Sequence, residues 1–179
     1  MSIANVPEVI NNFNVYNNGN KLIGISGSHT LPNFDAITET MAGAGGFGAG
    51  VLGEYETSMV GNFSSMEQEL SFAVLESDMF DLMDPTQPVD ITFRASQQST
   101  VKSTGALDYT SMRIVERGRF KSFEPGKMER GKQMDAKLKF ELFYILIEID
   151  GKTVIEYDKL NSVFTVNGKD LLEKVRSQC

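Results

Sequence analysis

Cysteine and histidine are almost absent from this chain of 179 residues, and their scarcity excludes several kinds of chemistry. The one cysteine, Cys179, is the last residue, so no disulfide forms within the chain and synthesis in a cytoplasm is expected. The one histidine, His29, has no second histidine or internal cysteine with which to hold zinc. No G-x-S-x-G motif surrounds a serine. We therefore expect neither a catalytic site nor a metal site.

Long apolar runs are also missing. The longest, from Leu142 to Ile147, is far shorter than the ~20 residues that cross a membrane. The N-terminal segment MSIANVPEVINN has no basic start and no apolar stretch, so no secretory signal is expected. With 41% hydrophobic and 23% charged residues, the composition is that of an ordinary globular protein. We expect one domain over residues 1–179, without a membrane anchor.

Basic residues are nearly absent from the first half of the chain. Residues 1–84 contain eleven acidic residues and a single base, Lys21, whereas the remainder has a small basic excess. The net charge of −7 argues against a dedicated nucleic-acid binder. The uneven distribution fits acidic and basic surfaces that meet between copies of the chain. Two oppositely charged, solvated faces explain it equally well.

Alternation of apolar and polar residues predicts an all-β dominated fold, an antiparallel β-barrel or sandwich. A long protruding hairpin is expected over residues 34–62, around a glycine-rich tip. Helices are expected over 77–83, with Ser77 as N-cap, and over 169–176 at the C-terminus. Turns are expected at Asn18-Gly19 and Asp150-Gly151. The predicted strands cover 11–17, 21–31, 66–75, 89–94, 107–123, 133–150, 153–157 and 163–166.

One long predicted strand has a basic face that contains Arg113, Arg117 and Arg119. No aromatic residues are interleaved there to stack on bases, so pairing with the acidic half of a neighbouring copy is favoured over nucleic-acid binding. In the next strand, Phe143, Ile145 and Ile147 make both faces apolar. A helix of the same chain or a second subunit must cover the extra face. Both alternatives remain open.

The glycine run Thr40–Gly53 contains the pattern of a dinucleotide-binding fingerprint. That chemistry needs a following helix and a βαβ unit, and neither is predicted, so no cofactor is expected. Glycine leaves such a tip flexible, and ordering costs about 1–2 kcal/mol per residue, which contacts with a partner offset. We expect an assembly arm, with an ordinary flexible loop as the alternative. The apolar anchors expected in it are Met41, Phe47, Val51 and Leu52.

Three stretches together resemble a known family over nearly the full length of the chain. They are NNFNVYNNGNKLIGISGSHTLPNF, VERGRFKSFEPGKMERGKQ and IDGKTVIEYDKLNSVFTVNGKDLLEKVR, in this order. The chain resembles the major tail tube proteins of contractile-tailed phages, which have relatives in R-type bacteriocins. The resemblance implies a non-enzymatic virion subunit, assembled in the bacterial cytoplasm.

The resemblance also implies hexameric rings that stack into a hollow tube inside a contractile sheath. Baseplate and terminator proteins would bind its ends. DNA would pass through the lumen of a phage tube without specific binding, and a bacteriocin tube would serve membrane puncture instead. Negative charge on the lumen wall would keep DNA sliding, with Glu67, Glu69 and Asp90 as candidates. The alternative function is a monomeric β-barrel that encloses a small molecule.

Overall fold

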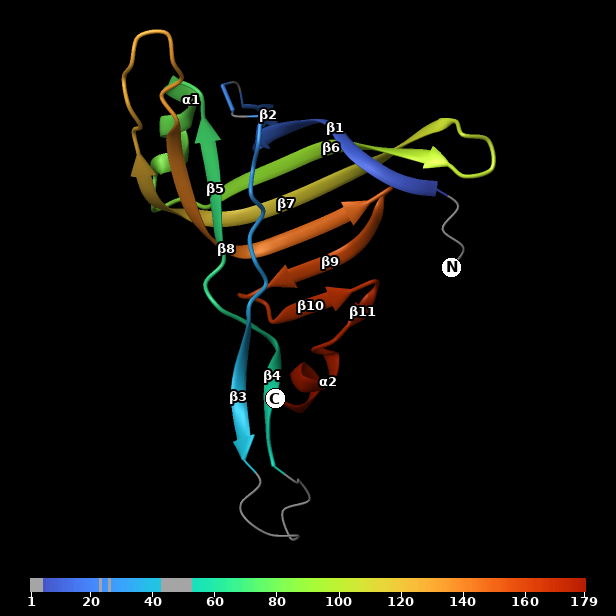
Figure 1. Cartoon of the computed structure of the whole chain (residues 1–179). Helices are drawn as coiled ribbons and strands as arrows, with labels where there is room; N and C mark the ends of the chain where they lie inside the picture. The colour runs from blue at the N-terminus through green and yellow to red at the C-terminus, as the bar shows by residue number, and fades with distance from the viewer. Residues whose placement is uncertain (1–4, 23, 26, 43–52) are drawn as a thin grey trace.

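The computed structural model describes residues 5–22, 24–25, 27–42 and 53–179. It is dominated by antiparallel strands, as the alternation predicts (Figure 1). The strands are β1 (Asn5–Asn17), β2 (Asn20–Lys21), β3 (Ala36–Ala42), β4 (Glu54–Phe63), β5 (Glu67–Phe72), β6 (Val89–Val101), β7 (Leu107–Glu124), β8 (Ala136–Ile149), β9 (Lys152–Asp158), β10 (Val163–Val166) and β11 (Lys169–Asp170). The helices are α1 (Ser77–Phe80), the 3-10 turn η1 (Asp81–Met83) and α2 (Glu173–Gln178).

One sheet contains nine of these strands in the order β11-β10-β9-β8-β7-β6-β1-β2, with β5 paired to β8 beside this path. The sheet curls, and an isolated bridge between Ile25 and Phe72 joins β5 to the segment that follows β2. The amide of Ala73 also donates to the carbonyl of Gly24 at 2.7 Å. The sheet is therefore closed into a barrel at this end. The part formed by β9, β10 and β11 remains an open extension.

Two of the tight turns have the chemistry that the sequence predicts. Asn18 and Gly19 join β1 to β2, and Asp150 and Gly151 join β8 to β9, all with positive φ. Asn-Gly and Asp-Gly pairs tolerate positive φ at both central positions of a two-residue hairpin turn, which matches the twist of the strands. These turns place sequence neighbours side by side in the sheet.

The core lies inside the curl of the sheet. Alternate residues of β6 and β8 point into it, and Leu70 and Phe72 of β5 add to it. Helix α1 contributes Met79, and the 3-10 turn η1 contributes Leu82, so these short helices close the core at one end. The inward side chains of β6 and of the first half of β8 are Val89, Ile91, Phe93, Leu138, Phe140 and Leu142.

A bulge in β8 explains why the stretch from Phe143 to Ile147 is apolar on both predicted faces. Arg117 of β7 pairs with Tyr144, and the next residue pairs with Leu142, so Phe143 is the extra residue. A bulge reverses the alternation beyond it. Ile145 and Ile147 therefore face the core of their own subunit, with Ile145 only 1% exposed.

Of the two alternatives for the second face of β8, cover by a helix of the same chain is wrong, and cover by a second subunit stays a prediction. Helix α2 buries none of its side chains. The outward side chains of β8 are half-buried by neighbours on adjacent strands instead. Tyr144 lies beside the guanidinium of Arg117, and Leu146 lies beside Val115 of β7. Side chains on the adjacent strands thus partly cover this face of β8, and no helix does so among the described residues.

Several boundaries differ from the sequence prediction; β1 begins earlier, at Asn5, and β6 continues to Val101. Residues 21–31 form no long strand, because Gly24 at φ +77° interrupts the extended backbone after β2. Ser77 begins α1 rather than capping it, and its hydroxyl bonds Asp78. The C-terminal helix starts later than predicted, since the turn at Asn167 and Gly168 folds β11 back onto β10.

Candidate assembly surfaces

Side chains on the convex side of the sheet, which we call the outer face, form a lattice of ion pairs. Arg113 of β7 contacts Glu148 of β8 at 2.6 Å. Arg117 contacts Asp90 of β6 at 2.9 Å, and this hydrogen bond raises the pKa of the guanidinium. In both pairs the acid and the base lie directly opposite each other on neighbouring strands, where opposite charges attract.

Tyr144 extends this lattice across β8. The guanidinium of Arg117 lies 4.8 Å from the centre of its ring. The phenol hydroxyl donates to Glu156 of β9 at 3.1 Å. Partial burial, together with the nearby Glu156 carboxylate, raises the pKa of Tyr144 to about 12. Tyr144 is therefore a neutral hydrogen-bond donor at physiological pH.

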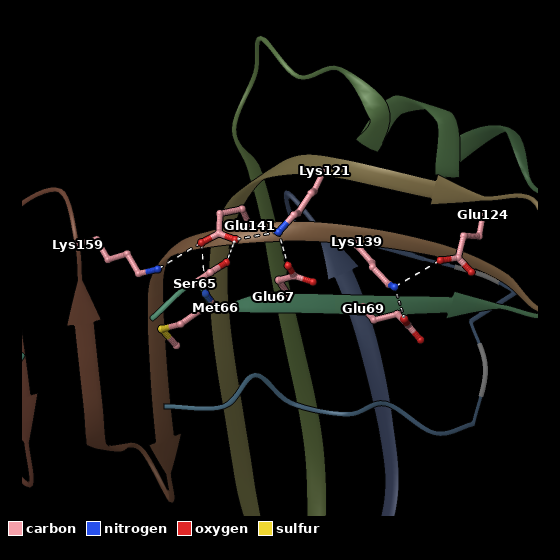
Figure 2. A network of polar contacts seen from close by, with 9 residues as sticks. All are labelled: Ser65, Met66, Glu67, Glu69, Lys121, Glu124, Lys139, Glu141 and Lys159. Carbon is pink, nitrogen blue, oxygen red and sulfur yellow. Dashed lines mark hydrogen bonds and ion pairs between the residues drawn. The ribbon is translucent and has the colours of Figure 1, made fainter. Parts of the chain in front are cut away.

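Glu141 is the centre of a second group of polar contacts, where β5 meets β8 (Figure 2). The Ser65 hydroxyl donates to its carboxylate at 2.5 Å, and the Met66 amide donates at 3.3 Å. Lys121 lies 3.7 Å away on one side and Lys159 lies 3.4 Å away on the other. Partial burial opposes ionisation, but these hydrogen bonds and Lys159 lower the pKa of Glu141 below its ordinary value.

Glu69 holds the adjacent part of the same lattice. It contacts Lys137 at 2.8 Å and Lys139 at 3.6 Å, and the hydrogen bond from Lys137 lowers the pKa of the carboxyl group. Lys139 also reaches Glu124 at 3.4 Å (Figure 2). Exposed ion pairs such as these contribute little stability. Their main effect is that basic groups on the outer face already have carboxylate partners.

The residues predicted to line a lumen all lie on this outer face, and each is ion-paired. Glu67 pairs with Lys121, Glu69 with two lysines, and Asp90 with Arg117. The predicted basic face of β7 also exists. However, Arg113 and Arg117 pair within their own chain, while Arg119 has no ion pair among the described residues. The outer face is thus closer to neutral than either prediction implied.

The hairpin of β3 and β4 forms a second surface, which we call the arm. It is a separate two-stranded sheet that projects away from the barrel (Figure 1). Met41 and Tyr55 face each other across its ladder and are 46% and 49% exposed. The opposite side of the arm is polar, with Thr40 paired to Glu56. A two-stranded hairpin is at best marginally stable alone in water, and no third strand joins this one within the described residues.

The other predicted anchors of the arm cannot be placed, because Phe47, Val51 and Leu52 lie outside the described residues. Phe143 is half-buried at its bulge. The interface predicted around it needs correction, because Ile145 is buried in the core and has no surface to offer a second copy.

A buried carboxyl group was missed by the sequence interpretation. Glu116 of β7 is 0% exposed and lies directly between Ile91 of β6 and Ile145 of β8. Neither carboxyl oxygen has a hydrogen-bond partner among the described residues. Burial raises the pKa of Glu116 to about 8. The sequence contained a signal for this burial. Glu116 lies two residues after Ile114 and therefore on the same face of the strand, and an acid at a core-facing position is unusual.

The remaining titratable residues do not assemble into a reactive site. His29 packs edge-on against Phe13 and Phe93, and burial lowers the pKa of its ring. Cys179 is a free, exposed thiol. Within the described ranges, no three potential ligands are grouped so as to hold a metal ion. None of the helices found there is both long and apolar enough to span a membrane.

These features describe a curled antiparallel sheet with a charge-paired face and an exposed arm. The family model described as phage tail tube protein FII matches residues 7–179. The tail tube protein of Escherichia phage P2 is 30% identical over 173 residues, which cover 96% of this chain and 96% of that relative. The chain belongs to the phage tail tube protein family. It is a structural component of a phage tail and not an enzyme.

Proposed function

We propose that six copies of this chain close into a ring and that the rings stack into the hollow inner tube of a contractile tail. The exposure of the arm in the lone subunit is the observation that carries this proposal. Both sides of the arm are exposed over most of its length, and Met41 and Tyr55 place apolar surface in water. Contacts with another copy of the chain would cover that surface and offset the cost of ordering the arm.

An open sheet edge supports lateral closure. Strand β1 pairs with β6 along one edge, but along its other edge β2 pairs only with Tyr16 and Asn17. The rest of that edge has no strand partner among the described residues. An unpaired edge is a template for a strand of another chain, and ring closure removes it. The ring would then have a continuous sheet as its wall.

The partners outside the tube are those that the likeness to tail tube proteins implies. A sheath protein would surround the tube, and baseplate and terminator proteins would bind its two ends. Assembly would take place in the cytoplasm of a bacterial host. The same subunit would serve a phage tail that conducts DNA or a bacteriocin tube that punctures a membrane.

Electron microscopy of the purified full-length chain tests the proposal. We expect six-fold rings at low protein concentration and hollow rods of uniform diameter at high concentration, without added nucleotide. The rods result from repeated head-to-tail contacts, which do not close on themselves. A chain that stays monomeric at every concentration would contradict the proposal and favour the small-molecule-binding barrel.

We further propose that the outer face lines the lumen and passes DNA because most of its cations, Arg119 excepted, are already paired with carboxylates. Phosphate binding gains free energy when Lys or Arg side chains replace condensed counterions. At this surface, phosphate would first have to displace Asp90 from Arg117, or Glu67 from Lys121. A charge-balanced wall would therefore bind DNA weakly without being strongly acidic.

Neutralising the three carboxylates of this face should increase DNA binding. The triple variant Glu67→Gln, Glu69→Gln and Asp90→Asn removes the acids paired with Arg117 and Lys137, and it leaves Lys121 and Lys139 with one acid each instead of two. We expect the unassembled subunit to bind a short DNA duplex roughly tenfold more tightly, with a steeper salt dependence. Fluorescence anisotropy at two salt concentrations measures both quantities.

A matched control changes the net charge equally at another place. The variant Glu76→Gln, Asp78→Asn and Asp81→Asn alters three exposed acids at or beside the short helices. It should bind DNA about as weakly as the unmodified subunit. If both triple variants bind equally well, only net charge matters, and the ion pairs of the outer face do not.

A further inference from the structure

Two projections extend from opposite ends of the molecule. One is the arm, and the other is the connection between β7 and β8, residues 125–135, which we call the basic loop (Figure 1). Figure 1 shows the basic loop rising beyond α1 at one end, while the arm hangs from the other end. Contacts between such opposite ends join copies head to tail.

The arm carries only negative charge. Its described residues include Glu39, Glu54 and Glu56, and they contain neither Lys nor Arg. None of the three carboxylates forms an ion pair within the part of the chain that the structure describes. Glu54 and Glu56 share the polar side of the hairpin, because they pair with Ala42 and Thr40. The polar side of the arm is therefore an unneutralised acidic strip.

The basic loop carries the complementary charge. Lys132 is paired with Glu129 at 2.6 Å, whereas Lys127 and Arg130 have no ion pair among the described residues. Met128 lies between them in the sequence and is 90% exposed. Burial of the exposed Met128 side chain and pairing of the two cations with acids would both stabilise a contact at this surface.

Hydrogen bonds within the basic loop define its shape. The amide of Lys127 donates to the carbonyl of Met134 at 2.9 Å, and the amide of Lys132 donates to the carbonyl of Glu129 at 3.2 Å. Gly126 has φ +76°, and a Cβ there would meet the Met134 carbonyl oxygen at 1.9 Å. A glycine at this position lets the two sides of the loop close on each other. The cations are therefore presented on a defined backbone.

We propose that the basic loop of one copy binds the acidic strip of the arm of the next copy along the tube. Lys127 and Arg130 would pair with Glu54 and Glu56, and Met128 would be covered by the same contact. This inference rests on the proposed stacking of rings and adds its axial contact. Opposite charges at opposite ends also set the polarity, because two arms or two basic loops repel each other.

Charge reversal tests this contact. The variant Lys127→Glu with Arg130→Glu should form rings, since the lateral edges are unchanged, but its critical concentration for rods should rise at least roughly tenfold. The variant Glu54→Lys with Glu56→Lys should show the same defect. The chain that combines all four substitutions should recover rod formation. Light scattering and electron microscopy measure the critical concentration, and added salt should raise it for the unmodified chain.

The control variant Lys152→Glu with Lys169→Glu reverses two exposed charges at other turns and should polymerise normally. If the unmodified chain forms rods and the Lys127→Glu, Arg130→Glu variant forms them equally well, the axial contact is overturned while the tube remains. Failure of the combined variant to recover would also overturn it, provided circular dichroism shows a folded subunit. If the unmodified chain never forms rods, the proposed function itself fails.

Discussion

Replacing Glu116 with glutamine should remove most of the loss of stability that the folded subunit suffers as pH rises. In the fold, the carboxyl group is buried between two isoleucines and has a pKa of about 8, against an ordinary value of 4.5. The neutral Glu116 carboxyl group makes its full contribution to the unfolding free energy below pH 4.5, the ordinary pKa of a glutamate. This contribution is lost as pH rises through about 8, because the ionised form is excluded from the core.

The size of this effect follows from the shift in pKa. Each pKa unit corresponds to about 1.4 kcal/mol, so the unmodified subunit should lose about 4 kcal/mol of unfolding free energy between about pH 5 and about pH 8.5. The Glu116→Gln variant should be equal to it at the lower pH and more stable by that amount at the higher pH. Denaturant unfolding of unassembled subunits across this range, followed by circular dichroism, measures the difference.

An exposed glutamate provides the control for this experiment. Glu76→Gln should leave the pH dependence unchanged, because Glu76 is exposed to solvent. Acids with lowered pKa values, such as Asp170 and Asp84, lose their contribution as pH falls, but they do so equally in all three proteins. A Glu116→Gln curve parallel to that of the unmodified subunit would show that Glu116 is ionised or solvated in the fold.

A charge placed at the Met41–Tyr55 pair should abolish rod formation without unfolding the subunit, although Glu39 already lies on the same side of the arm. Tyr55→Asp and Met41→Asp each place a carboxylate where we propose that a second copy docks. Both side chains are about half exposed in the lone subunit, so the fold itself loses little. In an assembled tube the same carboxylate would be buried without a partner, which is strongly unfavourable. We expect rods to disappear at concentrations where the unmodified chain forms them.

Matched substitutions on the polar side separate burial from charge. Thr38 and Ser58 pair across the same ladder but lie on the opposite side of the arm. Thr38→Asp and Ser58→Asp, made singly, should assemble normally. Normal rods from Tyr55→Asp would exclude the apolar side as an interface. Loss of rods in all four variants would show that the arm tolerates no added charge and that its two sides are not distinct.

Much of the fold was predictable because it depends on short sequence patterns. The alternation of apolar and polar residues correctly located β5, the start of β6, β7 and β8. The Asn-Gly and Asp-Gly pairs correctly located the turns from β1 to β2 and from β8 to β9. The hairpin flanking the glycine run was also predicted, as β3 and β4. The error in residues 21–31 arose at Gly24, where one residue with positive φ breaks a segment that otherwise alternates like a strand.

The candidate surfaces were less predictable, because they depend on which strands lie side by side. The basic face of β7 was predicted, but its neutralisation by Asp90 and Glu148 depends on the registers of β6 and β8. The bulge at Phe143 could not be predicted from alternation, since an apolar residue fits either face of a strand. That bulge turns Ile145 inward, where a surface was predicted.

The sequence by itself determined the class of fold, the main turns and the uneven charge. These depend on residue type and short spacing, which a linear pattern contains. Only the tertiary structure decided that the outer face neutralises itself, that Glu116 is enclosed, and that acidic arm and basic loop lie at opposite ends. Such features depend on strand register and chain direction in space, and contacts between residues distant in the sequence set both.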